Sequence, residues 1–170
     1  LQSIRETVPP LTMWFATEKI HGSNFSATTD GMTIKWGKRS SFLGESEMEQ
    51  FFNSHYVKEK YSEKILELFN AIKHASCIRV FGELCGGHYN DIKTSHPKSV
   101  KGVQKGVQYS PDIEFVIFDI VICVNDIWTY VSHHRVNTWC NEVGLKSVQI
   151  LHHALLDNLL QLDSTFQSTI

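Results

Sequence analysis

Residues 113–124 restrict the fold of this chain more than any other stretch, because the run is rich in valine, isoleucine and phenylalanine. These residues favour β-strands, and a strand with two apolar faces belongs in the centre of a sheet. Alternation predicts two faces, with Val116, Phe118, Ile120 and Ile122 on the first and Phe115, Ile117, Asp119, Val121 and Cys123 on the second. Asp119 is the exception, since acids are rarely buried without a partner.

Other segments supply the elements around this strand. The Asp30-Gly31 pair predicts a hairpin between strands at residues 24–29 and 32–38. Further strands are expected at residues 11–17, 77–84 and 127–131, and the Asn125-Asp126 turn makes the last of these a hairpin with the central strand. Helices are expected at 56–75, at 132–143, where Gly144 stops the helix, and at 151–162. This pattern is compatible with an α+β domain.

Length and composition exclude several classes of protein. The 170 residues, 42% of them hydrophobic and 20% charged, suit one globular domain over residues 1–170. No apolar run is long enough to span a bilayer, and no signal segment is recognisable. The widely spaced cysteines, Cys77, Cys85, Cys123 and Cys140, argue against a zinc ribbon or a disulfide framework. A reducing compartment, the cytoplasm or the mitochondrion, is therefore expected.

Charge is distributed unevenly along the chain. Residues 1–110 carry 14 Lys and Arg against 11 Asp and Glu, whereas residues 111–170 carry 2 against 7. A polyanion would therefore approach the first part more readily. The connection at residues 88–110 holds Lys93, Lys98, Lys101 and Lys105, and it reads equally as an RNA backbone track or as a solvated loop.

The string Glu18-Lys19-Ile20-His21-Gly22-Ser23-Asn24-Phe25 places a lysine between an apolar run and a glycine turn. An apolar flank favours the neutral amine, which is the nucleophilic form. Gly22 lets the backbone approach a ligand closely. A Lys-x-x-Gly sequence alone, however, is as compatible with an ordinary hairpin lysine.

Four ordered blocks carry a more specific signal. They are the Lys19 string, the Lys38-Arg39-Ser40 loop, Phe81-Gly82-Glu83-Leu84-Cys85-Gly86-Gly87, and Phe115-Val116-Ile117-Phe118-Asp119-Ile120. Together they resemble the RNA ligase 2 family of phage RNA ligases and trypanosome RNA-editing ligases, within the covalent nucleotidyltransferases. Residues 103–111 also resemble the editing-ligase branch. His21 separates this family from DNA ligases and capping enzymes, which usually have aspartate there.

The resemblance implies a fold and a reaction. The fold would be α+β, with antiparallel β-sheets and flanking helices, of the ATP-grasp-like ligase type, and the nucleotide would lie between the sheets. The reaction would join 5′-phosphate and 3′-hydroxyl ends of RNA through a lysyl-adenylate, using ATP and Mg²⁺.

The resemblance also implies roles for particular residues. Lys19 would be the catalytic nucleophile. The expected nucleotide-binding residues are Glu18, Ile20, His21, Gly22, Asn24, Arg39, Glu83 and Phe118. His21 and Asn24 would lie near the phosphate and ribose, Arg39 and Glu83 on the sugar side, and Phe118 under the adenine. No protein metal ligand is expected, and the His133-His134 and His152-His153 pairs read as surface or packing residues.

The chain departs from the family pattern near its end. Two further blocks, a Glu-Gly pair and a strand with two basic residues, are expected there. Residues 145–170, however, contain a single lysine, Lys146, no arginine and no glutamate. We therefore expect an adenylyltransferase domain truncated before these motifs and poorly active alone. A protein partner or second chain would complete it. The alternatives are a non-catalytic ligase-like scaffold that binds nucleotide or RNA, and an unrelated α+β binding domain.

Overall fold

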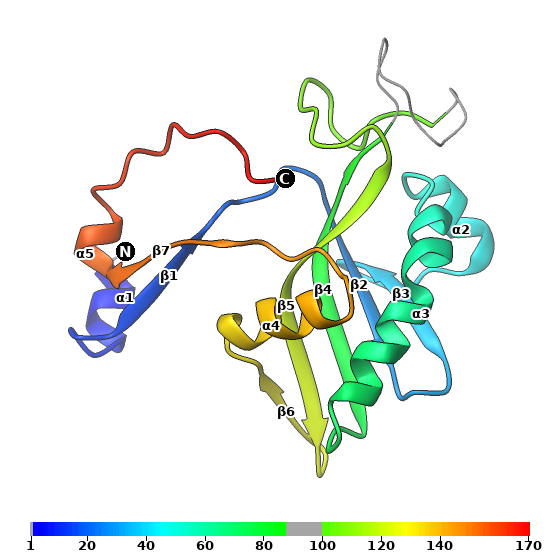
Figure 1. The fold of residues 1–170 in the computed structure, drawn as a ribbon, viewed down its shortest axis with the longest axis horizontal. Coiled ribbons are helices and arrows are strands. Elements are labelled where there is room, and N and C mark those ends of the chain that lie inside the picture. The colour runs from blue at the N-terminus through cyan, green and yellow to red at the C-terminus, as the bar shows by residue number, and fades with distance from the viewer. Residues whose placement is uncertain (1, 88–99) are drawn as a thin grey trace. The chain divides into compact units, whose positions relative to one another are not determined.

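The structure, a computed structural model, describes residues 2–87 and 100–170 (Figure 1). The chain divides into two compact units. The smaller unit comprises residues 1–19 and 149–169, and the larger unit comprises residues 20–148 with residue 170. Whether residues 1–170 act as one domain stays a prediction.

The larger unit is built on a five-stranded antiparallel sheet with strand order β3-β2-β4-β5-β6. Its strands are β2 (Ser23–Thr29), β3 (Ile34–Lys38), β4 (Cys77–Gly86), β5 (Ile113–Val124) and β6 (Ile127–Tyr130). Its helices are α2 (Glu45–Gln50), α3 (His55–Ala71) and α4 (His133–Glu142). The predicted α+β class with antiparallel sheets and flanking helices is confirmed.

Two tight turns confirm the predicted hairpins. In the β2–β3 turn, the Asp30 carboxylate accepts hydrogen bonds from the backbone N–H groups of Met32 and Thr33, and Gly31 has a φ of 90°. In the β5–β6 turn, Asn125 and Asp126 have φ values of 51° and 63°, the left-handed conformations that a two-residue hairpin loop requires.

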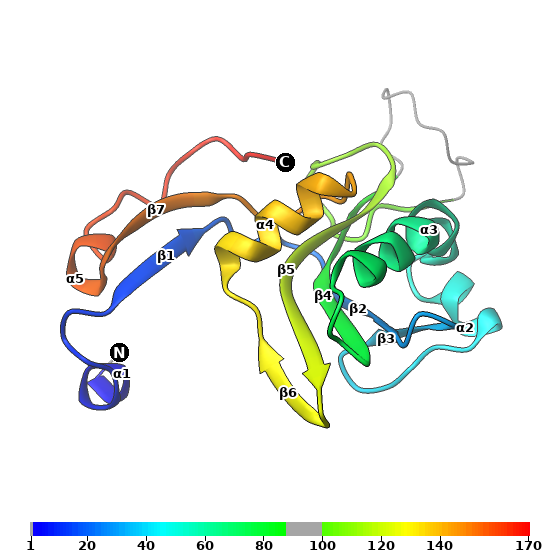
Figure 2. The ribbon, with the colours of Figure 1, turned by 60° about the horizontal axis from the view of Figure 1, so that its bottom comes forward.

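The sheet has two chemically different faces. On the inner face, apolar side chains of β2, β4 and β5 form one core with α3 and α4, which cover that face (Figure 2). The largest fully buried members include Phe25, Phe115, Ile65 and Leu68. Residues of β4 alternate between half-buried and buried positions from Cys77 to Leu84, so the opposite, outer face of the sheet is available for polar side chains.

A β-bulge in β5 changes the predicted faces of that strand. Phe81 of β4 is in register with Asp119, whereas the next residue, Gly82, is in register with Ile117, so Phe118 is the extra residue. Gly82 permits this pairing, because a Cβ there would lie 2.5 Å from the carbonyl oxygen of Val116.

The predicted grouping of Phe118 with Ile120 and Ile122 is therefore wrong. Ile120 and Ile122 pack in the main core, whereas Phe118 packs with Val116 in a second cluster. The bulge also moves Asp119 onto the face opposite Ile117, which explains how an acid fits within an apolar strand.

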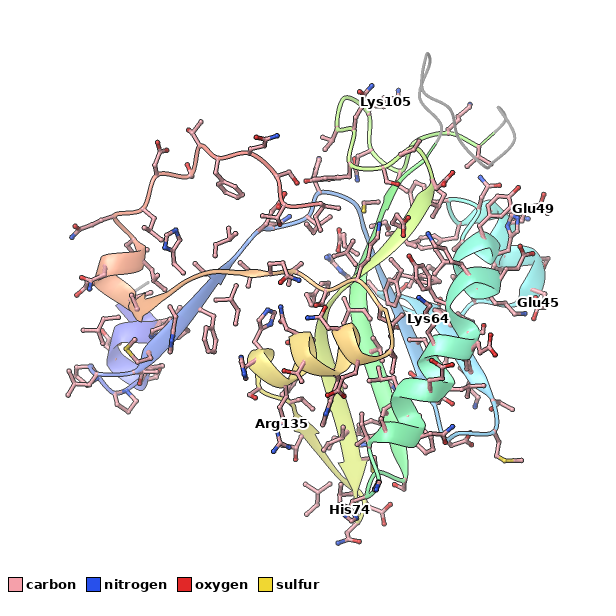
Figure 3. The ribbon with its side chains drawn as sticks, viewed as in Figure 1. Glu45, Glu49, Lys64, His74, Lys105 and Arg135 are labelled. Atoms are coloured by element: carbon pink, nitrogen blue, oxygen red, sulfur yellow. The ribbon has the colours of Figure 1, made fainter. Side chains whose placement is uncertain are left out.

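Helix α4 is tied to α3 at its C-terminal end. Lys64 of α3 donates a hydrogen bond of 2.6 Å to the carbonyl oxygen of Gly144, the residue at which the helical conformation ends with a φ of 68° (Figure 3). A cation at this end of a helix compensates its unpaired carbonyl groups. The predicted stop at Gly144 is confirmed.

The smaller unit holds α1 (Gln2–Thr7), β1 (Met13–Thr17), β7 (Ile150–Leu155) and α5 (Leu156–Leu159). Strands β1 and β7 pair antiparallel, and the rings of Phe15 and His153 stack with centroids 4.4 Å apart. The predicted helix at residues 151–162 is thus wrong over most of its length. Strand pairing outweighs the helical spacing of its leucines, because residues 150–155 complete a ladder with β1.

Several other features follow from the described residues. The short helices α1 and α2 have no counterpart in the sequence predictions. All four cysteines are free thiols. Among the described residues, no helix combines the length and the apolar character needed to cross a membrane.

A buried charge network connects α3 to β5 and to the segment after α4. The carboxylate of Glu114, which is 4% exposed, accepts hydrogen bonds from the Tyr61 hydroxyl and, at 2.7 Å, from the Lys60 ammonium group. The Lys146 ammonium group lies 3.3 Å from the same carboxylate. Burial alone would raise the pKa of Glu114, but these partners outweigh it and lower the pKa.

This network predicts a pH-dependent stability. A carboxyl group with a lowered pKa in the folded state stabilises the protein at neutral pH, and that contribution disappears as pH falls through the folded-state pKa. We expect Glu114→Gln to lower the free energy of unfolding by about 1–3 kcal/mol at neutral pH. The difference from wild type should shrink in urea titrations performed at acidic pH.

Glu45 provides a matched control, because it pairs with Lys58 while its side chain remains 82% exposed. Glu45→Gln should change the free energy of unfolding by less than about 1 kcal/mol at any pH. An equal effect of both substitutions, or a Glu114→Gln difference that does not change with pH, would contradict the assignment.

Candidate functional site

An open cleft of about 340 Å³ lies on the larger unit. It brings together residues far apart in the sequence, namely Gly22, Ser23, Asn24, Lys38, Arg39, Ser40, Phe51 and Glu83. Four of the predicted site residues, Gly22, Asn24, Arg39 and Glu83, are among them. Phe51, Ser23, Lys38 and Ser40 were not predicted as site residues.

Sheet register explains how Asn24 and Glu83 meet. Asn24 of β2 pairs directly with Glu83 of β4, and neighbouring residues of an antiparallel pair point to the same face. The adjacent residues Phe25 and Leu84 belong to the buried core, so alternation turns Asn24 and Glu83 to the outer face. An amide and a carboxylate are therefore placed side by side in the cleft.

Arg39 reaches the cleft from a tight turn at the end of β3. The backbone N–H of Lys38 donates to the carbonyl of Ser41 at 2.9 Å, which closes the turn around Arg39 and Ser40. Arg39 is exposed, whereas Lys38 is half-buried. The cleft thus combines two cations with the carboxylate of Glu83, a balance that favours an anionic ligand.

Gly22 stands at a position that only glycine can occupy in this backbone. A Cβ built there would lie 1.9 Å from the carbonyl oxygen of Leu84 and 2.9 Å from Cγ of Glu83. The close approach keeps the turn after Ile20 against β4 and leaves the adjoining cleft open.

The loop at residues 100–110 anchors the same turn through two hydrogen bonds. Gln104 Nε2 donates to the carbonyl oxygen of Gly22 at 2.8 Å, and the backbone N–H of His21 donates to the Tyr109 hydroxyl at 3.1 Å. Gln104 and Tyr109 were not predicted as site residues, although residues 103–111 of this loop resemble the editing-ligase branch. His21 itself is exposed, and the cleft lining does not include its side chain.

Lys105 also belongs to this loop (Figure 3). Of the four lysines predicted to form an RNA track, Lys93 and Lys98 lie outside the described residues. Lys101 and Lys105 are exposed. The choice between an RNA track and a solvated loop therefore stays open.

Phe118 and Ile20 lie in a second apolar cluster rather than in the cleft lining. This cluster contains Ile20, Cys85, Val116 and Val148, with Phe118 and Tyr109 packed against it. Phe118 is half-buried, and Ile20 is 5% exposed. The structure thus puts the predicted adenine platform, Phe118, in the same apolar cluster as the residue that follows Lys19 in the chain.

The carboxyl group of Asp119, the residue after Phe118, has a raised pKa. Burial raises the pKa of its carboxyl group, and the nearby His133 partly offsets that effect. The ring of His133 in turn lies 3.2 Å from the carbonyl oxygen of Val148. These contacts support a packing role for His133, as predicted for the histidine pairs.

Lys19 and Glu18 belong to the smaller unit. Glu18 is 7% exposed, and its carboxylate accepts hydrogen bonds from the Ser168 hydroxyl at 2.7 Å and from the backbone N–H of Thr169 at 2.9 Å. Burial would raise the pKa of Glu18, but these hydrogen bonds lower it. The role predicted for Glu18 in nucleotide binding stays a prediction, as does that of Lys19.

Gly22 generates a testable prediction about stability. Gly22→Ala should lower the free energy of unfolding by about 1–3 kcal/mol or more, because its methyl group collides with backbone that cannot move freely. Gly44→Ala is the control, since the nearest atom to a Cβ there is a side-chain oxygen at 3.4 Å. Equal stability of Gly22→Ala and wild type in urea denaturation would show that the turn is not held as described.

Comparison with known sequences places the chain in a family. The model of the RNA ligase family matches residues 12–167. RNA-editing ligase 2, mitochondrial, of Trypanosoma brucei brucei is 32% identical over 126 residues, which cover 63% of this chain and 30% of that protein. RNA-editing ligase 1, mitochondrial, of the same organism is 28% identical over 150 residues, covering 74% of this chain and 32% of that protein.

Solved structures show the same fold at lower identity. An apo variant of Naegleria gruberi RNA ligase matches with a TM-score of 0.62 and 17% identity over 92% of this chain and 40% of that one. A variant of that ligase with ATP and Mn matches with a TM-score of 0.60 and 18% identity over 91% of this chain and 40% of that one. The chain spans about a third of the length of the trypanosome relatives. By its match over residues 12–167, this chain belongs to the RNA ligase family.

Proposed function

We propose that this chain carries out the nucleotide-activating step of an ATP-dependent RNA ligase, with Lys19 as the residue that becomes adenylylated. The observation that carries the proposal is the cleft that gathers Gly22, Asn24, Arg39 and Glu83. Family membership supports RNA ligation in general. The particular reaction of this chain is our inference.

Chain connectivity supports the assignment of Lys19. Only three peptide links separate Lys19 from Gly22, so their Cα atoms lie within about 11 Å of each other. A lysine side chain spans a large part of such a distance. Along the chain, the nucleophile therefore comes directly before the turn that Gln104 and Tyr109 anchor in the larger unit.

The proposed first step forms one bond and breaks another. The neutral amine of Lys19 attacks the α-phosphorus of ATP, a nitrogen–phosphorus bond forms, and the bond to pyrophosphate breaks as the amine loses its proton. The adenylate then passes to a 5′-phosphate on RNA. A 3′-hydroxyl finally attacks that phosphate, releases AMP and seals the strand.

The cleft residues have complementary roles in this proposal. Lys38 stabilises the negative charge of the phosphates. The resemblance implies that Arg39 lies on the sugar side, but we assign it to the phosphates, because it lines the cleft with Lys38 and can form two parallel hydrogen bonds to a phosphate. Glu83 accepts hydrogen bonds from the ribose hydroxyls, and Asn24 on the neighbouring strand donates its amide N–H to phosphate or ribose oxygens. Phe118 supplies a flat ring for adenine, beside the buried Ile20. His21 contributes its exposed side chain near the phosphates.

The described residues fit a loosely held divalent metal rather than a protein cage. They contain no group of three His, Cys, Asp or Glu residues able to hold a metal ion. Mg²⁺ usually retains several waters and binds through one or two carboxylates together with substrate phosphates. Glu83 and Asn24 are the oxygen ligands that this cleft offers. When bound, the metal would neutralise part of the phosphate charge.

The proposed compartment and partners follow from similar reasoning. Free cysteines suit a reducing environment, and both trypanosome relatives are named as mitochondrial proteins. We therefore place the chain in the mitochondrion or the cytoplasm. Its macromolecular partner would be RNA with broken or nicked strands.

The direct test is covalent labelling. Incubating the chain with α-labelled ATP and Mg²⁺ should give a protein–AMP adduct that survives denaturing electrophoresis. Lys19→Ala should abolish the label, whereas Lys73→Ala, which removes an exposed lysine near the end of α3, should leave it unchanged. A persistent label in Lys19→Ala would contradict the assignment of the nucleophile. ATP binding without any label would favour the non-catalytic scaffold.

Arg39 gives a second test of the cleft. Arg39→Ala should weaken ATP binding about tenfold or more in calorimetric titrations, because it removes a charge-assisted hydrogen bond to phosphate. Arg135 is a suitable control, since its guanidinium group lies 5.9 Å from the Trp139 ring on α4, outside the cleft lining. Equal ATP affinity of the Arg39→Ala and Arg135→Ala variants would show that the nucleotide does not use this cleft.

A further inference from the structure

A second cleft of about 280 Å³ adjoins the first on the outer face of the sheet. The two share Asn24, Lys38, Arg39 and Ser40. The second cleft extends along β2, β3 and β4 in the direction away from Gly22, and adds Ser26, Gly37, Ser41, Phe42, Arg79 and Phe81. Because these lining residues are shared, the two clefts adjoin, and a long ligand can extend from one into the other.

Arg79 occupies the centre of an arginine–aromatic cluster, which we define as Arg79, Phe42, Phe81 and Trp128. Its guanidinium carbon lies 5.9 Å from the ring centres of Phe42 and Phe81 and 5.6 Å from that of Trp128. Its Nε donates a hydrogen bond of 2.9 Å to the Thr28 hydroxyl. Among the described residues, no carboxylate forms an ion pair with Arg79.

Two rings of this cluster remain accessible. Phe42 is 50% exposed and Trp128 is 47% exposed, so each ring keeps a surface that the protein does not cover. Exposed aromatic rings beside a planar guanidinium group are the arrangement on which unpaired nucleobases stack. Paired bases in a duplex do not present their faces in this way.

The backbone holds Phe42 in position before any ligand arrives. Phe42 pairs with Gly37 in an isolated bridge, and the next residue, Leu43, donates its N–H to the carbonyl of Trp36 at 2.9 Å. Gly37 leaves room for this ring, since a Cβ there would lie 3.3 Å from Cδ1 of Phe42. A preorganised ring loses little conformational entropy on binding.

The charge of the cleft selects a polyanion. Lys38, Arg39 and Arg79 line it, and no acidic side chain does. Lys35 adds a further exposed cation on this face, because Lys35 and Arg79 are both in register with Thr28. Cations interleaved with open aromatic rings match the phosphates and bases of a single strand.

We propose that this second cleft binds an unpaired segment of the RNA substrate, with at least one base stacked on the arginine–aromatic cluster. The inference rests on the proposed RNA ligase function and adds the form of RNA that the site prefers. The strand would run from the cluster past Lys38 and Arg39 towards the nucleotide cleft. It would thus guide an RNA end to the adenylate.

The test compares single-stranded and duplex RNA by fluorescence anisotropy. The Phe42→Ala, Trp128→Ala double variant should bind a labelled single-stranded RNA at least about fivefold more weakly than wild type. Its affinity for the same sequence as a duplex should change less. Arg79→Lys should also weaken single-strand binding, because it keeps the charge but loses the planar group.

Phe166→Ala is the matched control, since Phe166 is also 50% exposed but lies outside this cleft. It should bind both RNAs as wild type does. Tryptophan emission gives an independent readout, because RNA should quench wild type more strongly than Trp128→Phe. The inference is overturned if the double variant keeps its affinity for single-stranded RNA, a result that would favour a protein partner for this surface. It is also overturned if Phe166→Ala loses as much single-strand affinity as the double variant.

Failure of this inference can be separated from failure of the proposed function. Wild-type protein should be tested for the covalent AMP label in the same preparation. Loss of RNA affinity in the double variant supports the stacking site whether or not the label forms. A labelled wild type whose RNA affinity does not depend on the cluster would retain the proposed function and overturn only this inference.

Discussion

The division of the β2–β4–β5 ladder into an apolar and a polar face is the constraint on which the candidate site depends. Helices α3 and α4 bury the inner face, where a large-to-small substitution typically costs about 2–5 kcal/mol. The strand period then fixes Asn24 and Glu83 on the other face as neighbours. The core therefore determines both the stability of the fold and the position of its polar groups.

Two local departures from regular structure shape the candidate site on this ladder. Gly22 brings the turn after Ile20 into contact with β4, and the loop at 100–110 fastens it through Gln104 and Tyr109. The bulge at Phe118 places that ring with Ile20 instead of in the main core. Each feature sets the place of a side chain that the proposed reaction needs.

Much of the fold could be predicted from local pattern. A continuous run of β-favouring apolar residues indicated the central strand at 113–124, and turn chemistry at Asp30-Gly31 and Asn125-Asp126 indicated both hairpins. The bulge could not be predicted, because it depends on how β4 and β5 pair. Residues 150–155 have helical spacing, but pairing with β1 decided their conformation. Gln104 and Tyr109 meet the Gly22 turn only through long-range contacts, which single-sequence reasoning does not reveal.

We propose above all that ATP binds on the polar face of the larger unit, next to the turn that follows Lys19. A crystal structure of the chain with a non-hydrolysable ATP analogue tests it most directly. We predict the phosphates beside Lys38 and Arg39, the ribose near Asn24 and Glu83, and the adenine against Phe118. An analogue bound elsewhere, with the cleft around Gly22 empty, would contradict the account.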